Sequence, residues 1–77
     1  MIRKKLHKHQ GEPIVIDLTG PDGNAYALMS MATNFGNQLG WDKVHIQELM
    51  NEMMEDDYEY LVQVFDREFG TFVILER

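Results

Sequence analysis

The chain has 77 residues, a formal net charge of −6 at pH 7 and no cysteine. This length describes one small domain, near the size at which a single core is only just sufficient. The lack of cysteine excludes disulfides and thiolate metal sites, which leaves oligomerisation as the leading means of extra stability. No apolar run approaches the roughly 20 residues of a membrane helix, and no apolar signal-peptide core follows the basic N-terminus, so we expect a soluble intracellular protein.

Charge is unevenly distributed along the chain. The first ten residues carry four of the seven basic side chains and no acidic one, whereas residues 11–77 carry 13 acidic and three basic side chains. Residues 1–11 therefore predict a basic, flexible N-terminal arm, and residues 12–77 predict a single acidic domain. A body of this charge repels nucleic-acid phosphates, so nucleic acid is disfavoured as a partner.

The segment 13–18 has the composition of a β-strand. Three consecutive β-branched residues follow Pro13, which suits the first position of a strand, and both faces of the strand are apolar. A turn of glycine and polar residues follows at 19–24 and leads into a helix. Asp22 or Thr19 is expected to cap that helix.

A helix is expected over 22–39, because apolar residues recur there at spacings of three and four and form one stripe. Gly36 weakens the middle of this helix, and Gly40 is placed to end it. Trp41 follows directly, and we expect its side chain to pack back onto the helix.

Two further helices are expected in the acidic half of the chain. The first covers 42–54 and begins at Asp42, a favoured N-cap residue. The second covers 57–69, because Asp56 followed three residues later by Glu59 has the form of a capping box. Both helices carry an apolar stripe on one face.

A second strand is expected over 71–75, and both of its faces are again apolar. The predicted order is therefore β-α-α-α-β, a small single α+β domain with two short strands and three helices. Strands with two apolar faces are hard to cover in one subunit of this size, and a bare sheet edge is a template for pairing. We therefore expect a homodimer in which sheets or helix faces of two copies meet.

The turn between the first strand and the first helix presents backbone N–H groups at a helix N-terminus, where many proteins hold a ligand. It has neither the lysine and spacing of a Walker loop nor a G-x-G-x-x-G pattern, and Asp17 and Asp22 oppose a phosphate. A structural corner is the favoured interpretation. The alternative is a small-molecule site for a nucleotide-like signal, formed by Thr19, Gly20, Asp22, Gly23 and Asn24.

The familiar catalytic and metal-binding patterns are missing from the sequence. It has no G-x-S-x-G elbow and no H-E-x-x-H motif. His7 and His9 flank a lysine, which resists a cation, and His45 stands alone. We expect no catalytic residue, no metal and no cofactor, and hence a protein that is not an enzyme. An enzyme or metal protein built on Asp17, Asp22 and the histidines is a further alternative.

The densest acidic cluster lies between the second and third helices. It lacks the glycine of an EF-hand calcium loop, so calcium binding is not expected. Helix capping with a solvated face is the favoured interpretation, docking of a basic partner is the second, and acid–base catalysis is the third. Most of the six methionines are expected in the core or a dimer interface. Met31 and Met54 fall off the main apolar stripes and are expected at an interface. The expected partner-binding surface consists of Glu52, Met54, Glu55, Asp56, Asp57, Glu59 and Tyr60.

Two segments of the chain resemble a family of small, uncharacterised tailed-bacteriophage proteins. They are IVIDLTGPDGNAYA over 14–27 and YEYLVQVFDREFGTFVILER over 58–77. The resemblance covers nearly all of the chain after the basic arm, and its motifs carry no assigned chemistry. It implies a protein made in the cytoplasm of an infected bacterium, where small phage proteins often act by binding to host machinery.

Together these observations predict a non-enzymatic, acidic, homodimeric binding protein. Its expected partner is a host or phage protein, and neither a membrane nor a nucleic acid is expected. Charge on such a surface would speed its encounter with a basic partner.

Overall fold

The computed structural model describes residues 2–4 and 14–77. The elements run in the order β1 (Ile2–Arg3), β2 (Val15–Asp17), α1 (Ala25–Gln38), α2 (Lys43–Met53), α3 (Tyr58–Phe69) and β3 (Ile74–Glu76). From β2 to β3 this is the predicted β-α-α-α-β order, so the small α+β fold is confirmed. Sequence analysis did not predict β1, which lies within the segment expected to be an arm. Residues 5–11 of that arm, His7 and His9 among them, lie outside the described residues.

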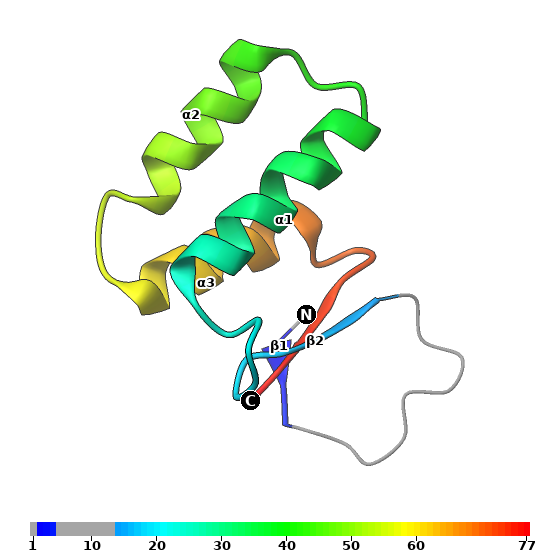
Figure 1. The fold of residues 1–77 in the computed structure, drawn as a ribbon, viewed down its shortest axis with the longest axis vertical. Helices are drawn as coiled ribbons and strands as arrows, with labels where there is room; N and C mark the ends of the chain where they lie inside the picture. Colours follow the sequence, from blue (N-terminus) through cyan, green and yellow to red (C-terminus); the bar gives the residue numbers. More distant parts are fainter. Residues whose placement is uncertain (1, 5–13) are drawn as a thin grey trace.

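The three strands form one parallel sheet in the order β1-β3-β2, with β3 at its centre (Figure 1). Leu75 of β3 lies between Ile2 and Ile16 in the sheet, and Leu75 and Ile16 are both buried in the core. The next row along, Val15 beside Ile74, faces the opposite side because side chains alternate along a strand, and both residues are half-buried. Both faces of the sheet therefore carry apolar residues, as predicted.

Helices α1 and α2 begin with a side chain that accepts a backbone hydrogen bond. Asp42 caps α2 as predicted, by accepting from the N–H three residues later at 2.8 Å. The cap of α1 is Asn24, which accepts in the same way at 2.8 Å. The prediction of Asp22 or Thr19 was wrong, because the backbone is still in turns at 18–22 and adopts the extended conformation of a cap only at Asn24.

The cap and the start of helix α3 each lie one residue later than predicted, at Asp57 and Tyr58. Asp57 accepts from the N–H of Tyr60 at 2.9 Å, whereas Asp56 accepts from the N–H of Asp57 at 2.8 Å. Glu59 binds Arg77 instead of turning back to the start of the helix. The capping box of Asp56 and Glu59 was therefore wrong, although the helix that it predicted is present.

The corner between α1 and α2 depends on two glycines. Gly40 has a φ of +80°, a left-handed conformation that ends α1 as predicted. A Cβ atom at Gly36 would lie 3.0 Å from Ile46 and 3.1 Å from Trp41, so Gly36 lets α2 and the indole approach α1 closely. Trp41 is half-buried and donates its backbone N–H to the carbonyl of Gly36 at 2.9 Å, which confirms that it packs back onto α1.

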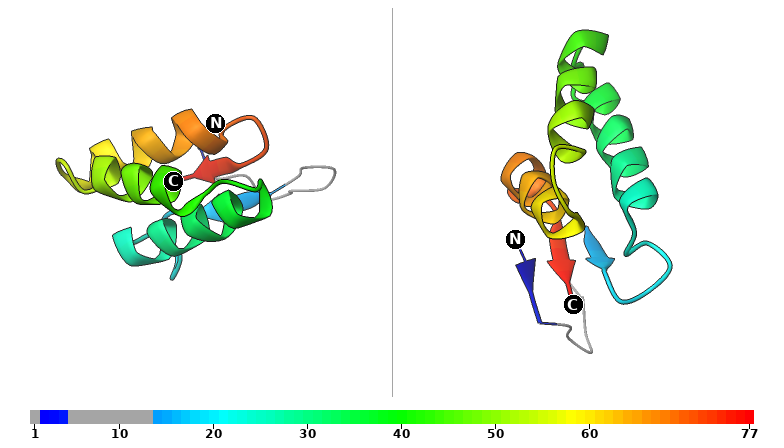
Figure 2. Two further views of the ribbon diagram at one scale, coloured as in Figure 1. Left: turned by 90° about the horizontal axis from the view of Figure 1, so that it is seen from above. Right: turned by 90° about the vertical axis from the view of Figure 1, so that its left-hand side faces the viewer.

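Helix α3 contributes buried side chains to the same core as α1, α2 and the strands. Figure 2 shows α1 and α2 extending away from the strands, while α3 lies closer to them. The rings of Phe65 and Phe69 on α3 are fully buried, 5.0 Å apart between centroids, and Phe35 of α1 lies 5.4 Å from Phe69. Within residues 2–4 and 14–77, no helix has the length and apolar character needed to cross a membrane.

Candidate functional site

An apolar groove opens where the start of α1 meets the connection between α2 and α3. Its volume is about 300 Å³, which lies at the lower end of the range for small-molecule sites. Two aspartates, Asp56 and Asp57, are part of its lining. The apolar lining consists of Ala25, Tyr26, Met29, Met53, Met54, Tyr58 and Leu61.

Several of these apolar side chains are exposed to solvent. Tyr26 is 88% exposed, Met54 58% and Tyr58 37%, whereas Met53 and Leu61 beneath them are buried. Single exposed apolar residues are normal on protein surfaces, but a group of them around one groove marks an interaction site. The groove therefore combines a fixed apolar floor with an exposed apolar rim.

Helix caps hold the walls of the groove in place. Asn24 fixes the start of α1, and Tyr26 and Met29, three residues apart in its first turns, share one side of that helix. Asp57 fixes the start of α3, where Tyr58 is the first helical residue. Partial burial raises the pKa of Tyr58, so its phenol stays neutral at physiological pH.

The two aspartates give the groove a negative side. Asp56 and Asp57 each accept one backbone hydrogen bond through Oδ1. Among residues 2–4 and 14–77, no group donates a hydrogen bond to either Oδ2 atom, and no lysine or arginine lines the groove. The charge of the groove is thus uncompensated by the part of the chain that the structure describes.

The predicted partner-binding residues divide into two groups. Met54, Asp56 and Asp57 line the groove. Of the predicted interface methionines, Met54 is exposed, whereas Met31 is half-buried against the core. Glu52, Glu55, Glu59 and Tyr60 lie outside the groove, and all four take part in contacts with arginine or with one another.

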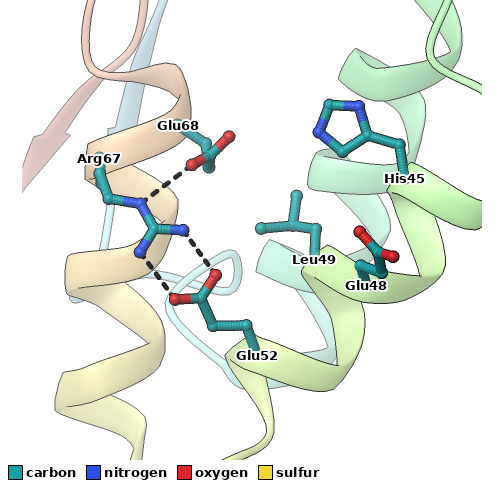
Figure 3. A pocket seen from close by; sticks show the side chains of 6 residues that line it. All are labelled: His45, Glu48, Leu49, Glu52, Arg67 and Glu68. Carbon is teal, nitrogen blue, oxygen red and sulfur yellow. Dashed lines mark hydrogen bonds and ion pairs between the residues drawn. The ribbon is translucent and has the colours of Figure 1, made fainter.

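Glu52 and Arg67 join α2 to α3 (Figure 3). The guanidinium donates to both carboxylate oxygens of Glu52, at 2.6 and 2.7 Å, and to Glu68 at 2.9 Å. The hydrogen bonds from Arg67 lower the pKa of Glu52. His45, Glu48 and Leu49 complete a shallow pocket of about 150 Å³ around this pair. Because its cation is already bound by two carboxylates, this pocket is a structural junction between helices.

The phenol of Tyr60 adds to this junction. Its hydroxyl donates to Glu52 at 3.4 Å and lies 3.5 Å from Glu55. Desolvation, followed by the nearby negative charges of Glu52 and Glu55, raises the pKa of Tyr60. Tyr60 and Glu55 therefore support the α2–α3 connection from outside the groove.

Glu59 and Arg77 form a second ion pair, between α3 and the residue that follows β3. The two guanidinium nitrogens donate to the two carboxylate oxygens at 2.6 and 2.8 Å. The hydrogen bonds from Arg77, with a further one from Gln63, lower the pKa of Glu59 to about 2. This pair ties the start of α3 to the end of the sheet.

In the turn at 19–24, the alternative ligand site, the side chains of Thr19 and Asn24 make hydrogen bonds within the local segment. Asp17 Oδ1 accepts from both the N–H and the hydroxyl of Thr19, at 2.9 and 2.6 Å. Asn24 caps α1 and donates to a carbonyl of the turn at 2.8 Å. At Gly23 a Cβ atom would lie 1.8 Å from a backbone oxygen of Leu18, so only glycine fits. These contacts make the turn a structural corner. This is the interpretation that the sequence favours.

Metal ligands do not gather in the described part of the chain, where no group of three or more histidine and acidic side chains could hold an ion. His45 instead stacks on Trp41, with ring centroids 3.9 Å apart. Sequence analysis did not single out Tyr26, Met29, Tyr58 and Leu61 as site residues. The one available signal was Tyr26, an aromatic residue outside the apolar stripe of its helix.

Comparison of the chain with protein-family models, with curated proteins and with solved structures finds no match. The features of the described residues that bear on function are the groove, its exposed apolar rim and its charge.

Proposed function

We propose that this protein is a non-enzymatic binding protein that holds a segment of another protein in the groove between α1 and α3. The observation that carries the proposal is the exposure of Tyr26, Met54 and Tyr58 around one concave, apolar surface. Tyrosine and methionine are enriched in protein interfaces, and methionine adapts its shape to different partners. Covering these side chains on binding would remove apolar surface from water.

The proposed contact surface keeps part of the acidic cluster between α2 and α3 and adds aromatic residues of the groove. Met54, Asp56 and Asp57 remain in the proposed contact surface, and Tyr26 and Tyr58 join them. Glu52 and Glu59 already hold arginines, so they contribute to the field of the surface more than to direct contact. A negative surface of this kind speeds encounter with a basic partner.

The proposed setting is the bacterial cytoplasm, with a host or phage protein as the partner. The support for this setting is the resemblance of segments 14–27 and 58–77 to tailed-bacteriophage proteins. The alternative small-molecule site at 19–24 has less support, because the side chains of Thr19 and Asn24 are already used in local hydrogen bonds.

A homodimer is part of the same proposal. In the described sheet β1 and β2 are edge strands, which are templates for pairing, and the chain is small enough to benefit from a second copy. Light scattering on the purified protein tests this point. A mass twice that of the 9.0 kDa chain is expected, and a monomer at tens of micromolar would contradict it.

Affinity capture from a bacterial lysate tests the binding function. Tyr26→Ser and Met54→Ser each remove one exposed side chain from the groove, and Val44→Ser removes one of similar exposure elsewhere on α2. We expect one partner to be recovered with the wild type and with Val44→Ser. The groove variants should recover it at least about tenfold less well, since a central aromatic or apolar anchor contributes upwards of ~2 kcal/mol. Equal recovery by all four proteins would refute the proposal.

A further inference from the structure

We infer that the groove takes an arginine side chain from its partner, carried next to an apolar residue of the same segment. This inference rests on the proposed function and names the chemistry of the partner at that site. It depends on three features of the groove: its floor, its aromatic walls and its negative side.

The floor suits a flexible aliphatic stem. Met53 is fully buried and Leu61 is 3% exposed, so the base of the groove is fixed, while Met29 is half-buried and Met54 is exposed. Thioether side chains are polarisable and adjust to irregular shapes. The methylene groups of an arginine bury well along such a surface while the charged head stays in contact with polar groups.

The walls suit a planar cation. Tyr26 and Tyr58 both line the groove and are both exposed, and among the described residues neither ring stacks on another ring. A guanidinium group stacks on aromatic faces and is attracted by their electrons. An ammonium group is more strongly hydrated and has no flat face, so lysine fits these walls less well.

The carboxylates of Asp56 and Asp57 would form the ion pair with that cation. Asp56 and Asp57 each use Oδ1 for a backbone hydrogen bond, which holds the carboxylates still, and neither Oδ2 accepts from a described residue. The arginines nearest in the chain, Arg67 and Arg77, are bound to Glu52 and Glu59. Among the described residues no lysine or arginine lines the groove, so we assign the cation to the partner.

Other occupants match the groove less completely. A purely apolar segment would cover the floor but would desolvate two carboxylates without pairing them, which is costly. A phosphate-bearing ligand would be repelled by the same carboxylates. An arginine beside an apolar residue satisfies the floor, the walls and the acidic side together.

The test uses NMR of isotope-labelled protein, which detects millimolar binding. The probe is the tripeptide acetyl-Leu-Arg-Leu-amide, compared with its lysine analogue and with the analogue carrying citrulline, a neutral residue of nearly the same shape. We expect the arginine peptide to shift the backbone signals of Tyr26, Met54 and Tyr58 saturably. Citrulline should weaken binding about fivefold, the size of a favourable exposed ion pair, and lysine should fall between the two.

A double variant, Asp56→Asn with Asp57→Asn, removes the charge but keeps the side-chain oxygens that accept the backbone hydrogen bonds. Its matched control is Asp42→Asn, because Asp42 caps α2 through the same kind of bond and does not line the groove. We expect the double variant to bind the arginine and citrulline peptides alike, and Asp42→Asn to keep the preference. No saturable shift at the groove, equal binding of the three peptides, or an unchanged preference in the double variant would each overturn the inference.

The outcome also separates this inference from the proposed function. If lysate capture depends on Tyr26 and Met54 but the tripeptides show no preference, the groove binds a protein and the arginine assignment is wrong. If capture does not depend on these side chains and the tripeptides do not bind, both are wrong. A doubled mass that Tyr26→Ser reduces to that of one chain would show that a second copy occupies the groove, and this would overturn the arginine assignment.

Discussion

The two ends of α3 both carry aromatic side chains, but these side chains differ in burial. Near its end, Phe69 is fully buried and stacks on Trp41 at 5.7 Å, with Phe35 and Phe65 beside it. At its start, Tyr58 is 37% exposed beside the groove. The aromatic cluster at one end stabilises the fold, and the exposed end belongs to the proposed binding surface. Stability and binding should therefore be separable by substitution along one helix.

The largest expected effect is on stability, at the covered end. Phe69→Ala should lower the free energy of unfolding by about 3–5 kcal/mol, because it leaves a cavity among four other rings. Urea unfolding followed by circular dichroism measures this change. The matched control is Tyr26→Ala, which removes an 88% exposed ring and should change stability by no more than about 0.5 kcal/mol. Similar losses for the two variants would erase the contrast between the two ends.

The next largest effect on stability is expected at Asp57, which both caps α3 and lines the groove. Asp57→Ala removes the cap of α3 and should cost about 1 kcal/mol of stability, whereas Asp57→Asn keeps the capping oxygen and should cost only a few tenths. Thermal unfolding of both variants measures the difference. If the alanine and asparagine variants were equally stable, Asp57 would not act as the cap.

A smaller effect is expected from pH. The pKa of Glu59 is lowered to about 2 by Arg77, below its ordinary value of 4.5, so its contribution to stability is complete above about pH 4.5 and is lost as the pH falls towards 2. The melting temperature should therefore decrease over this interval. Glu59→Gln should show a shallower decrease, because it lacks the titrating group. Parallel profiles for the two proteins would show that the Glu59–Arg77 pair does not stabilise the fold in solution.

The smallest effect on stability is expected at the groove itself. Met54→Ser and Val44→Ser should each change the free energy of unfolding by less than about 0.5 kcal/mol, since both side chains are mostly exposed. Only Met54→Ser should lose partner capture. A large destabilisation by Met54→Ser would mean that the rim of the groove belongs to the core.

The helices, β2 and β3 could be predicted from local patterns, but the pairing of distant segments could not. Asp42 is a strong cap signal and was placed correctly, while two adjacent aspartates left the start of α3 ambiguous by one residue. β1 has only two residues, in a basic segment, and becomes a strand because β3 lies beside it. No local pattern signals such a strand.

The candidate site, too, could be predicted only as far as it depends on residues that are close in sequence. The acidic cluster was visible in the sequence, but which acids remain uncompensated depends on arginines that lie 15 residues from Glu52 and 18 from Glu59. The groove itself joins Tyr26 and Met29 of α1 to residues of the α2–α3 connection, and their meeting is set by how the helices pack. Apolar stripes predict which faces turn inward but not where two helices leave a gap between them.

The position of β3 at the centre of the sheet has a consequence for how the chain folds. Leu75 must meet Ile16 and Ile2 across the whole helical region, and closing so long a loop is slow, whereas the three helices meet their neighbours through short connections. We therefore expect the helices to assemble first and the sheet to close last. No strand residue lines the groove, so the binding surface would form before the sheet that completes the domain.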